Sequence, residues 1–253
     1  MKIKVGTYNI CHCADFSDYT KDSSGDTQPS VLNIKGTADV IKSLGCDVIG
    51  LNEVYENGSS PREDFKAQTK KLAELAGYSY YYYAQGQDYD YTDIGNAILS
   101  KFPIKSYTTE VVPTVPESER TGNYWYENRI LGIADVDFNG KTVKVIETHF
   151  GLAPIELERI VKKCCEVIDG TNFPVVLMGD FNVKPDDPWL EKIYERLKSA
   201  AAEKNNSEFT WSTYNPNRQI DYIFAPKTAE ILSYEVHKFK ISDHRPITAE
   251  IEL

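Results

Sequence analysis

The stretch Val175-Val176-Leu177-Met178-Gly179-Asp180-Phe181-Asn182 is the most informative part of this sequence. Its apolar run predicts a buried strand that ends at a glycine, and a carboxylate and a carboxamide then follow two residues apart. Because side chains alternate along an extended segment, Asp180 and Asn182 are expected on the same side of the chain. The segment therefore predicts a strand end that presents a water-activating base beside a neutral hydrogen-bond donor.

On either side of this segment the sequence changes repeatedly between strand and helix patterns. Strands are expected at residues 3–10, 46–51, 78–83, 95–100, 104–112, 129–138, 142–149, 175–180, 219–225, 231–239 and 246–253. Helices are expected at residues 31–44, 62–76, 154–168 and 187–197. Meanders and β-helix-β units follow one another without a linker, which predicts one α/β domain over residues 1–253 with two sheets inside and helices outside.

Composition and charge restrict the classes of protein and partner. The chain has 253 residues, of which 41% are hydrophobic and 26% charged, as in ordinary globular proteins. A net charge of −10 argues against strong bulk DNA binding, because phosphate neutralisation supplies most of that affinity, but it says little against a small phosphorylated substrate. We see neither an apolar run of the roughly 20 residues that a transmembrane helix needs nor a signal-peptide pattern, so we expect a cytoplasmic protein without a transmembrane segment.

The five cysteines are too few for a disulfide framework and indicate a reducing compartment. Cys11 and Cys13 flank His12, a pattern that resembles part of a metal cluster. No second Cys/His pair with zinc-type spacing follows, so a structural role for these thiols is expected. His12 and His237 lie outside the motifs described below, and both are expected on the surface of a loop or strand.

Four carboxylates, from Glu53, Asp180, Asp221 and Asp243, stand at or near predicted strand ends. If they are gathered in one cleft, they repel one another strongly at low effective dielectric, and a divalent cation with hard oxygen ligands would relieve that repulsion. Mg²⁺ suits such a site best, since it keeps several waters and takes one or two carboxylates together with substrate phosphate oxygens, and Mn²⁺ can substitute. The absence of a His-rich ligand set argues against zinc.

The order and identity of six short segments resemble the endonuclease/exonuclease/phosphatase superfamily, the DNase I-like metal-dependent hydrolases. These segments are Thr7-Tyr8-Asn9, Gly50-Leu51-Asn52-Glu53, Glu147-Thr148-His149, Gly179-Asp180-Phe181-Asn182, Gln219-Ile220-Asp221-Tyr222-Ile223-Phe224 and Ser242-Asp243-His244. The resemblance runs from Asn9 to His244 and implies a four-layered α/β/β/α sandwich with two packed mixed β-sheets and helices on the outer faces. It also implies a Mg²⁺-dependent phosphoesterase of the compact bacterial type.

The resemblance assigns three residues to the metal. Glu53 is the expected ligand, and Asn9 is expected to position the ion or the attacking water through its neutral carbonyl. Asp243 resembles the family's second carboxylate near the metal. Asn52 stands where the family usually has Gln, a conservative difference that affects only fine positioning.

Five further residues are implied to act on the phosphate and the water. Asp180 would orient and deprotonate the water, and Asn182 would donate to the phosphate. His149 and His244 would bind the phosphate from opposite sides and stabilise the charge of the transition state. Asp221 would hydrogen-bond His244, which fixes the tautomer and favours the protonated ring.

Three more residues are expected near the substrate. Asn96, in Gly95-Asn96-Ala97-Ile98-Leu99-Ser100, resembles a family Asn that supports the site through hydrogen bonds. Arg129 is a candidate for a bidentate phosphate clamp, and Tyr126 (or Tyr124) for stacking on a substrate group. Specificity is expected in the loops at residues 11–28, 57–63 and 113–126.

The predicted activity is therefore in-line hydrolysis of a phosphodiester or phosphomonoester in a small phosphorylated molecule or short nucleic acid, by a monomer. Two enzymatic alternatives stay open, a DNA endonuclease or exonuclease and a sphingomyelinase-like lipid phosphodiesterase. A third alternative, from a different class, is a catalytically silent binding module that has kept the fold.

Overall fold

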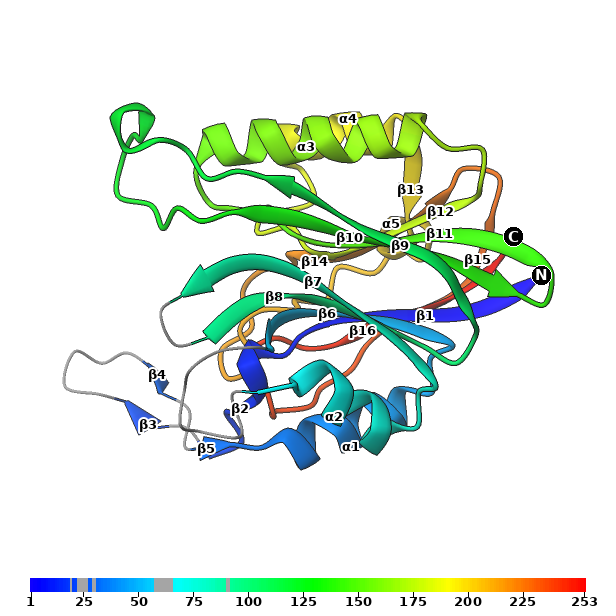
Figure 1. The fold of residues 1–253 in the computed structure, drawn as a ribbon, viewed down its shortest axis with the longest axis horizontal. Coiled ribbons are helices and arrows are strands. Elements are labelled where there is room, and N and C mark those ends of the chain that lie inside the picture. Colours follow the sequence, from blue (N-terminus) through cyan, green and yellow to red (C-terminus); the bar gives the residue numbers. More distant parts are fainter. Residues whose placement is uncertain (19, 22–26, 29–30, 57–65, 90–91) are drawn as a thin grey trace.

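A computed structural model describes the chain except at residues 19, 22–26, 29–30, 57–65 and 90–91. Two six-stranded sheets pack face to face, and helices cover the outer face of each sheet (Figure 1). This is the four-layered sandwich with two mixed sheets that the sequence predicts, and the fold class is confirmed. The two termini lie together at one end, where the Met1 amino group donates to the Leu253 carbonyl over 2.7 Å.

The strand order places the predicted motif segments at the centre of each sheet. The first sheet has the order β15 (Glu230–Val236), β16 (Ile247–Glu252), β1 (Lys2–Asn9), β6 (Val48–Tyr55), β8 (Thr92–Ser100) and β7 (Tyr80–Tyr89). The second has the order β13 (Leu197–Ser199), β14 (Asp221–Pro226), β12 (Val175–Asp180), β11 (Lys141–His149), β10 (Arg129–Phe138) and β9 (Ile104–Val112). Only β1–β6 and β11–β12 are parallel among these neighbouring pairs.

Strand register aligns the residues that the sequence marks as functional. In the first sheet Asn9 is opposite Asn52. In the second sheet Asp180 is opposite His149 on one side and Asp221 on the other. Because the carboxyl ends of parallel strands meet at one edge of a sheet, each parallel pair delivers its polar side chains to one edge of its own sheet. A hydrogen bond between Asp180 N and Asn52 Oδ1 shows that these two edges lie side by side.

Helices α1 (Ile34–Leu44) and α2 (Gln68–Ala76) cover the first sheet, and α3 (Pro154–Asp169) with the short α4 (Glu191–Tyr194) covers the second (Figure 1). Helix α1 begins where the Asn33 side chain accepts from Gly36 N over 2.7 Å, and it ends at Gly45 with φ 67°. Among the described residues, no helix combines the length and the apolar character needed to cross a membrane.

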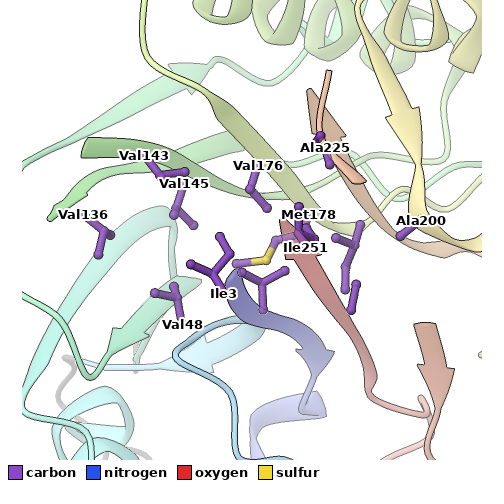
Figure 2. Close-up of a cluster of buried hydrophobic side chains, with 14 of the residues drawn as sticks. Ile3, Val48, Val136, Val143, Val145, Val176, Met178, Ala200, Ala225 and Ile251 are labelled. Atoms are coloured by element: carbon purple, nitrogen blue, oxygen red, sulfur yellow. The ribbon is translucent and has the colours of Figure 1, made fainter. Parts of the chain in front are cut away.

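The space between the sheets is filled by the inward side chains of the strands (Figure 2). Ile3, Val48, Val136, Val176 and Ile251 are each at most 2% exposed. Burial of one such side chain contributes about 1.5–3 kcal/mol, so this layer ties strands from both ends of the chain together. The polar strand ends are therefore held on a close-packed platform.

One carboxyl group lies inside that platform. Glu147 on β11 is fully buried, and its Oε1 accepts from Thr7 Oγ1 over 2.8 Å. A Cβ atom at Gly50 would lie 1.6 Å from Glu147 Oε2, so only glycine permits the sheets to approach this closely. Burial raises the pKa of Glu147 well above its ordinary value, which favours the neutral carboxylic acid.

Three expected helices differ from the structure. The helix expected at 187–197 is wrong, since Pro188–Leu190 is a 3-10 turn, α4 ends at Tyr194, and Leu197–Ser199 pairs with β14. In the segment 31–44, Val31–Leu32 pairs with Ala14–Asp15 before the Asn33 cap, so the helix begins later. The helix expected at 62–76 begins at Gln68, and residues 62–65 lie outside the described part of the chain.

Candidate active site

A cleft of about 730 Å³ opens at the edge where the motif segments converge. Most of the polar residues predicted from sequence line it, namely Glu53, Arg129, His149, Asp180, Asn182, Asp243 and His244. Asn9 and Asp221 are buried directly behind and hydrogen-bond to residues in the wall. Segments that are far apart in the sequence thus form one polar pocket.

Asp180 lies at the centre of this arrangement. Its Oδ2 is 3.6 Å from His149 Nε2, 3.5 Å from His244 Nε2 and 3.1 Å from Asn9 Nδ2. Burial raises the pKa of Asp180 to about 7, Asp221 adds to this effect, and His244 opposes it. A carboxyl group with that pKa can accept a proton near neutral pH, which a general base requires.

The two imidazoles differ in their charge. Burial, helped by Arg129 and His244, holds the pKa of His149 well below its ordinary value, so this ring is neutral. Burial opposes a charge on His244 as well, but the carboxylates of Asp221, Asp180 and Asp243 raise the pKa of that ring well above its ordinary value. One histidine is therefore a neutral hydrogen-bonding group, and the other is a cation.

Asp221 fixes the orientation of the charged ring. Its two carboxylate oxygens lie 3.0 and 3.2 Å from His244 Nδ1, and the pair is almost fully buried. The Nε2 atom of His244 then faces Asp180 and the cleft. This hydrogen bond is the one expected from the order of the motifs.

Asn182 stands beside the neutral ring. Its backbone is in the left-handed region with φ 54°, and its amide nitrogen lies 3.0 Å from the Phe150 carbonyl and 3.1 Å from His149 Nε2. Asp180 Oδ1 accepts from Asn182 N over 2.9 Å. Asn182 therefore faces the same pocket as Asp180. The cause is the turn after β12, and not the alternation of side chains along a strand that the sequence predicts.

Glu53 presents its carboxylate from an irregular point of β6. The pairing of β6 with β8 shifts between Leu51 and Val54, and Glu53 has φ 56°, a strained value for a residue other than glycine. Burial and then the charge of Asp243 raise the pKa of Glu53. These two carboxylates are hard oxygen donors that repel one another, so the residues present fit a divalent cation, which they would hold.

The orientation of Asn9 differs from the expected one. Its Nδ2 donates to Glu53 Oε1 over 2.9 Å as well as to Asp180, while its carbonyl oxygen accepts from Cys11 N over 3.1 Å. Carboxylates are the strongest acceptors in reach, so they attract the amide donor. Asn9 thus links the two carboxylates in this structure, while its side-chain carbonyl accepts from the backbone of the next turn.

Asn52 and Asn96 connect the sheets below the cleft. Asn52 Nδ2 donates to the Thr148 carbonyl over 3.0 Å and to Asn96 Oδ1 over 3.2 Å. Its Oδ1 accepts from Asp180 N over 3.1 Å. Asn96 is 1% exposed, and its hydrogen bond to Asn52 connects it to the site, so the supporting role that the resemblance implies stays a prediction.

Arg129 is held between two glutamates that the sequence analysis did not single out. Its Nη1 donates to Glu127 Oε1 over 2.7 Å, and its Nε lies 3.6 Å from Glu156 Oε2. Of its donors only Nη1 has a hydrogen bond to a described residue, and Nε is buried without one, so the bidentate phosphate clamp stays a prediction. Arg129 also places a buried positive charge beside His149.

In the segment 124–126, the aromatic side chain that lines the cleft is Trp125 rather than Tyr126. Tyr126 Oη hydrogen-bonds the backbone of Thr121, whereas Trp125 lines the cleft with its Nε1 3.2 Å from Glu127 Oε2. Side-chain direction in an irregular loop follows tertiary contacts, so the sequence offered no signal for this difference. Of the loops expected to carry specificity, the one at 57–63 lies outside the described residues.

Two further cleft residues and one histidine were not expected. Arg218 stacks on Trp211 with 4.8 Å between guanidinium and ring centre, and Trp211 Nε1 donates to Asp243 Oδ2 over 3.2 Å. His12, which was expected on a loop surface, also lines the cleft. The positions of the strand ends do not predict which residues of other segments reach the cleft.

The chain belongs to the Endonuclease/Exonuclease/phosphatase family, whose model matches residues 6–244. Members of this family are hydrolases that act on phosphoesters, and they generally use divalent metals. Over 238 residues the chain is 26% identical to the Escherichia coli K12 protein YbhP, covering 85% of this chain and 87% of YbhP.

Solved structures share the fold. An endonuclease/exonuclease/phosphatase from Beutenbergia cavernae has a TM-score of 0.76 at 23% identity and covers all of this chain and 72% of its own. A mannosyl-6-phosphatase from Bacteroides thetaiotaomicron has a TM-score of 0.70 at 18% identity and covers 99% of this chain and all of its own. Truncated TDP2 from Caenorhabditis elegans has a TM-score of 0.68 at 18% identity and covers all of this chain and 98% of its own.

Proposed function

We propose that this protein is a Mg²⁺-dependent phosphoesterase that hydrolyses a small phosphorylated substrate by in-line attack of water. The observation that carries the proposal is the position of Asp180 Oδ2 between the Nε2 atoms of His149 and His244, at 3.6 and 3.5 Å. A base between a neutral and a cationic imidazole can hold a water and a phosphate in one pocket.

The roles of the residues follow from their charge. Asp180 accepts the proton of the attacking water, since its pKa of about 7 keeps a useful fraction ionised at neutral pH. His244, oriented by Asp221, donates from Nε2 to a non-bridging phosphate oxygen and carries the positive charge that stabilises the transition state. On the opposite side Asn182 Nδ2 lies 3.1 Å from His149 Nε2, and a bound phosphate oxygen would replace this contact and accept a neutral hydrogen bond there.

Glu53 and Asp243 are the proposed ligands of the cation, and Asn9 keeps the Glu53 carboxylate beside Asp180. When bound, Mg²⁺ would neutralise phosphate charge and assist the leaving oxygen. Mn²⁺ offers the same hard-ligand chemistry and is expected to substitute.

The cleft favours a compact substrate over long duplex DNA. Four of its carboxylates, on Glu53, Glu127, Asp180 and Asp243, face two guanidinium groups, and Arg129 is already paired with Glu127. Phosphate backbones bind where cations are in excess. The aromatic rings of Tyr55, Tyr89, Trp125 and Trp211 in the cleft suit the ring faces of a neutral leaving group.

The direct test is hydrolysis of bis(para-nitrophenyl) phosphate and para-nitrophenyl phosphate by metal-stripped protein with and without added Mg²⁺. We expect turnover of at least one ester with Mg²⁺ and none without it. Asp180→Asn should abolish it, whereas the matched control Asp186→Asn, at an exposed position, should not. Equal inactivity of wild type and Asp180→Asn across both esters and several sugar and nucleotide phosphates would favour the silent binding module.

The nuclease alternative is separated by binding to a DNA duplex at increasing salt. A contact through several phosphates weakens steeply as salt rises. We expect no such binding, and a steep salt dependence together with DNA cleavage would replace the small-substrate proposal with a nuclease.

A further inference from the structure

The turn that follows β1 carries two thiols and an imidazole on an unusual backbone. Cys11, His12 and Cys13 have φ values of 43°, 47° and 67°, all left-handed, and none is glycine. Each such residue costs roughly 1–2 kcal/mol, so surrounding contacts must hold the turn. Cys11 N donates to Asn9 Oδ1 over 3.1 Å, Cys13 N to the Ile10 carbonyl over 2.8 Å, and Gln68 Nε2 to the His12 carbonyl over 2.9 Å.

This turn brings a thiol and an imidazole to the carboxylate of Glu53. One possible ligand atom from each of Cys11, His12 and Glu53 lies within 4.8 Å of the other two, and all three residues are half-buried. The His12 ring is also fixed in place, because it stacks on Tyr55 with 4.7 Å between ring centres and 10° between planes. His12 and Glu53 both line the cleft, so a solvated ion can reach them.

The spacing is close to that of a mixed thiolate, imidazole and carboxylate metal site. Zinc–sulfur, zinc–nitrogen and zinc–oxygen bonds of about 2.0–2.3 Å in a tetrahedron place ligand atoms roughly 3.5 Å apart. The three ligand atoms would therefore have to move closer together by about 1 Å from the upper limit of their separation, and side-chain rotation can supply this movement. Sulfur and nitrogen donors select Zn²⁺ or Co²⁺ and are poor ligands for Mg²⁺.

We propose that Cys11, His12 and Glu53 form a binding site for a thiophilic divalent cation, with Zn²⁺ as the expected ion, at the rim of the cleft. The sequence pattern argued against zinc because a second Cys/His pair is missing, but the third ligand comes from a different strand of the folded sheet. Since Glu53 is also a proposed Mg²⁺ ligand, the two ions compete for one carboxylate.

The remaining cysteines do not offer an equivalent site. Cys13, Cys46, Cys164 and Cys165 are at most 8% exposed and belong to apolar clusters. Cys13 lies in the same turn as Cys11 and is fully buried, which makes Cys13→Ser the matched control for Cys11→Ser.

The test uses the full chain, stripped of metal under reducing conditions and titrated with Co²⁺ in the absence of any phosphoester. We expect one equivalent of Co²⁺ to produce a thiolate-to-cobalt charge-transfer band that added Zn²⁺ removes. The band should disappear in Cys11→Ser and persist in Cys13→Ser. A second group of potential ligands, Asp180, Asp221 and His244, contains no sulfur and cannot give this band.

Zinc affinity is measured in parallel by isothermal titration calorimetry. Cys11→Ser, His12→Gln and Glu53→Gln should each weaken Zn²⁺ binding at least about 10-fold, since each variant removes a ligand. A wild type without the charge-transfer band, or unchanged affinity in Cys11→Ser, would overturn the proposal. Loss of the band in Cys13→Ser would also overturn it, because the sulfur ligand would then be a different one.

Both readouts are independent of phosphoester hydrolysis. A protein that binds Zn²⁺ as described but hydrolyses no ester would leave this site standing and remove the proposed function. Hydrolysis with Mg²⁺ in a protein that gives no thiolate band would support the proposed function and remove the Zn²⁺ site.

Discussion

Asn52 Oδ1 accepts a 3.1 Å hydrogen bond from the backbone nitrogen of Asp180, so a side chain of one sheet fixes the end of a strand in the other. The two residues are 128 positions apart in the sequence, and both are almost fully buried. The same amide also holds Thr148 and Asn96. The position of the proposed base therefore depends on contacts between sheets, and this dependence can be tested.

Replacement of Asn52 should lower both stability and turnover. Asn52→Leu leaves three buried polar groups without their partner, which costs about 3 kcal/mol of unfolding free energy. The displaced Asp180 should reduce kcat at least about 10-fold with little change in KM. Urea unfolding and steady-state kinetics measure both effects, and Asn215→Leu at an exposed position is the control. Unchanged kcat in a folded Asn52→Leu protein would show that the link does not position the base.

The activity should fall in acid with the protonation of Asp180. Burial raises the pKa of this carboxyl to about 7, and only the ionised form can accept the water proton. We expect kcat/KM to decrease about tenfold per pH unit below the pKa of the free enzyme, and a bound cation shifts this limb to lower pH. The pH profile of kcat/KM is the measurement. A profile that stays flat down to about pH 4, the ordinary carboxyl range, would exclude Asp180 as the titrating base.

The charge of His244 should depend on Asp221. The carboxylates around His244 raise its pKa well above the ordinary value, so its contribution to stability is complete below about pH 6.5 and is lost as the pH rises through the raised folded-state pKa. Asp221→Asn should lower the pKa of His244 and weaken this pH dependence. The four histidines of the chain make NMR titration of the ring protons practical. A wild-type His244 that titrates near pH 6.5 would contradict the prediction.

Glu147 should destabilise the fold at high pH. Its pKa is raised well above the ordinary value by burial, so its favourable contribution is present below about pH 4.5 and is lost as the pH rises toward the folded-state pKa. Glu147→Gln is neutral at every pH, and its stability relative to wild type should grow with pH by at least about 1.4 kcal/mol, the equivalent of one pKa unit. Urea unfolding across the pH range measures this difference. Glu158→Gln, at an exposed position, should show no such trend.

The sequence predicted regular strands well and irregular segments poorly. The expected ranges 129–138 and 175–180 match β10 and β12. Long apolar runs predict such strands well, because their side chains are buried on both faces of the sheet. The segment 187–197 looked helical because its apolar spacing suits a helix, but Leu197–Ser199 found a strand partner in β14 that lies more than 20 residues later. A partner at that distance leaves no local signal.

The same distinction holds for the candidate site. Residues at strand ends, such as Asp180 and Glu53, could be predicted because the topology brings strand ends together. The direction of the Asn9 amide, the choice of Trp125 over Tyr126 and the approach of His12 to Glu53 depend on loop packing. Those details have no pattern in the sequence, and they required the three-dimensional arrangement.

The close approach of Gly50 to Glu147 has a consequence for changing the specificity of this protein. With 1.6 Å between a hypothetical Cβ at Gly50 and a carboxyl oxygen of Glu147, the two sheets have no spare room between them at this point. Mutations intended to enlarge the cleft should therefore be made in residues that line it, such as Trp125 or Arg218, and should leave Gly50 and Glu147 unchanged.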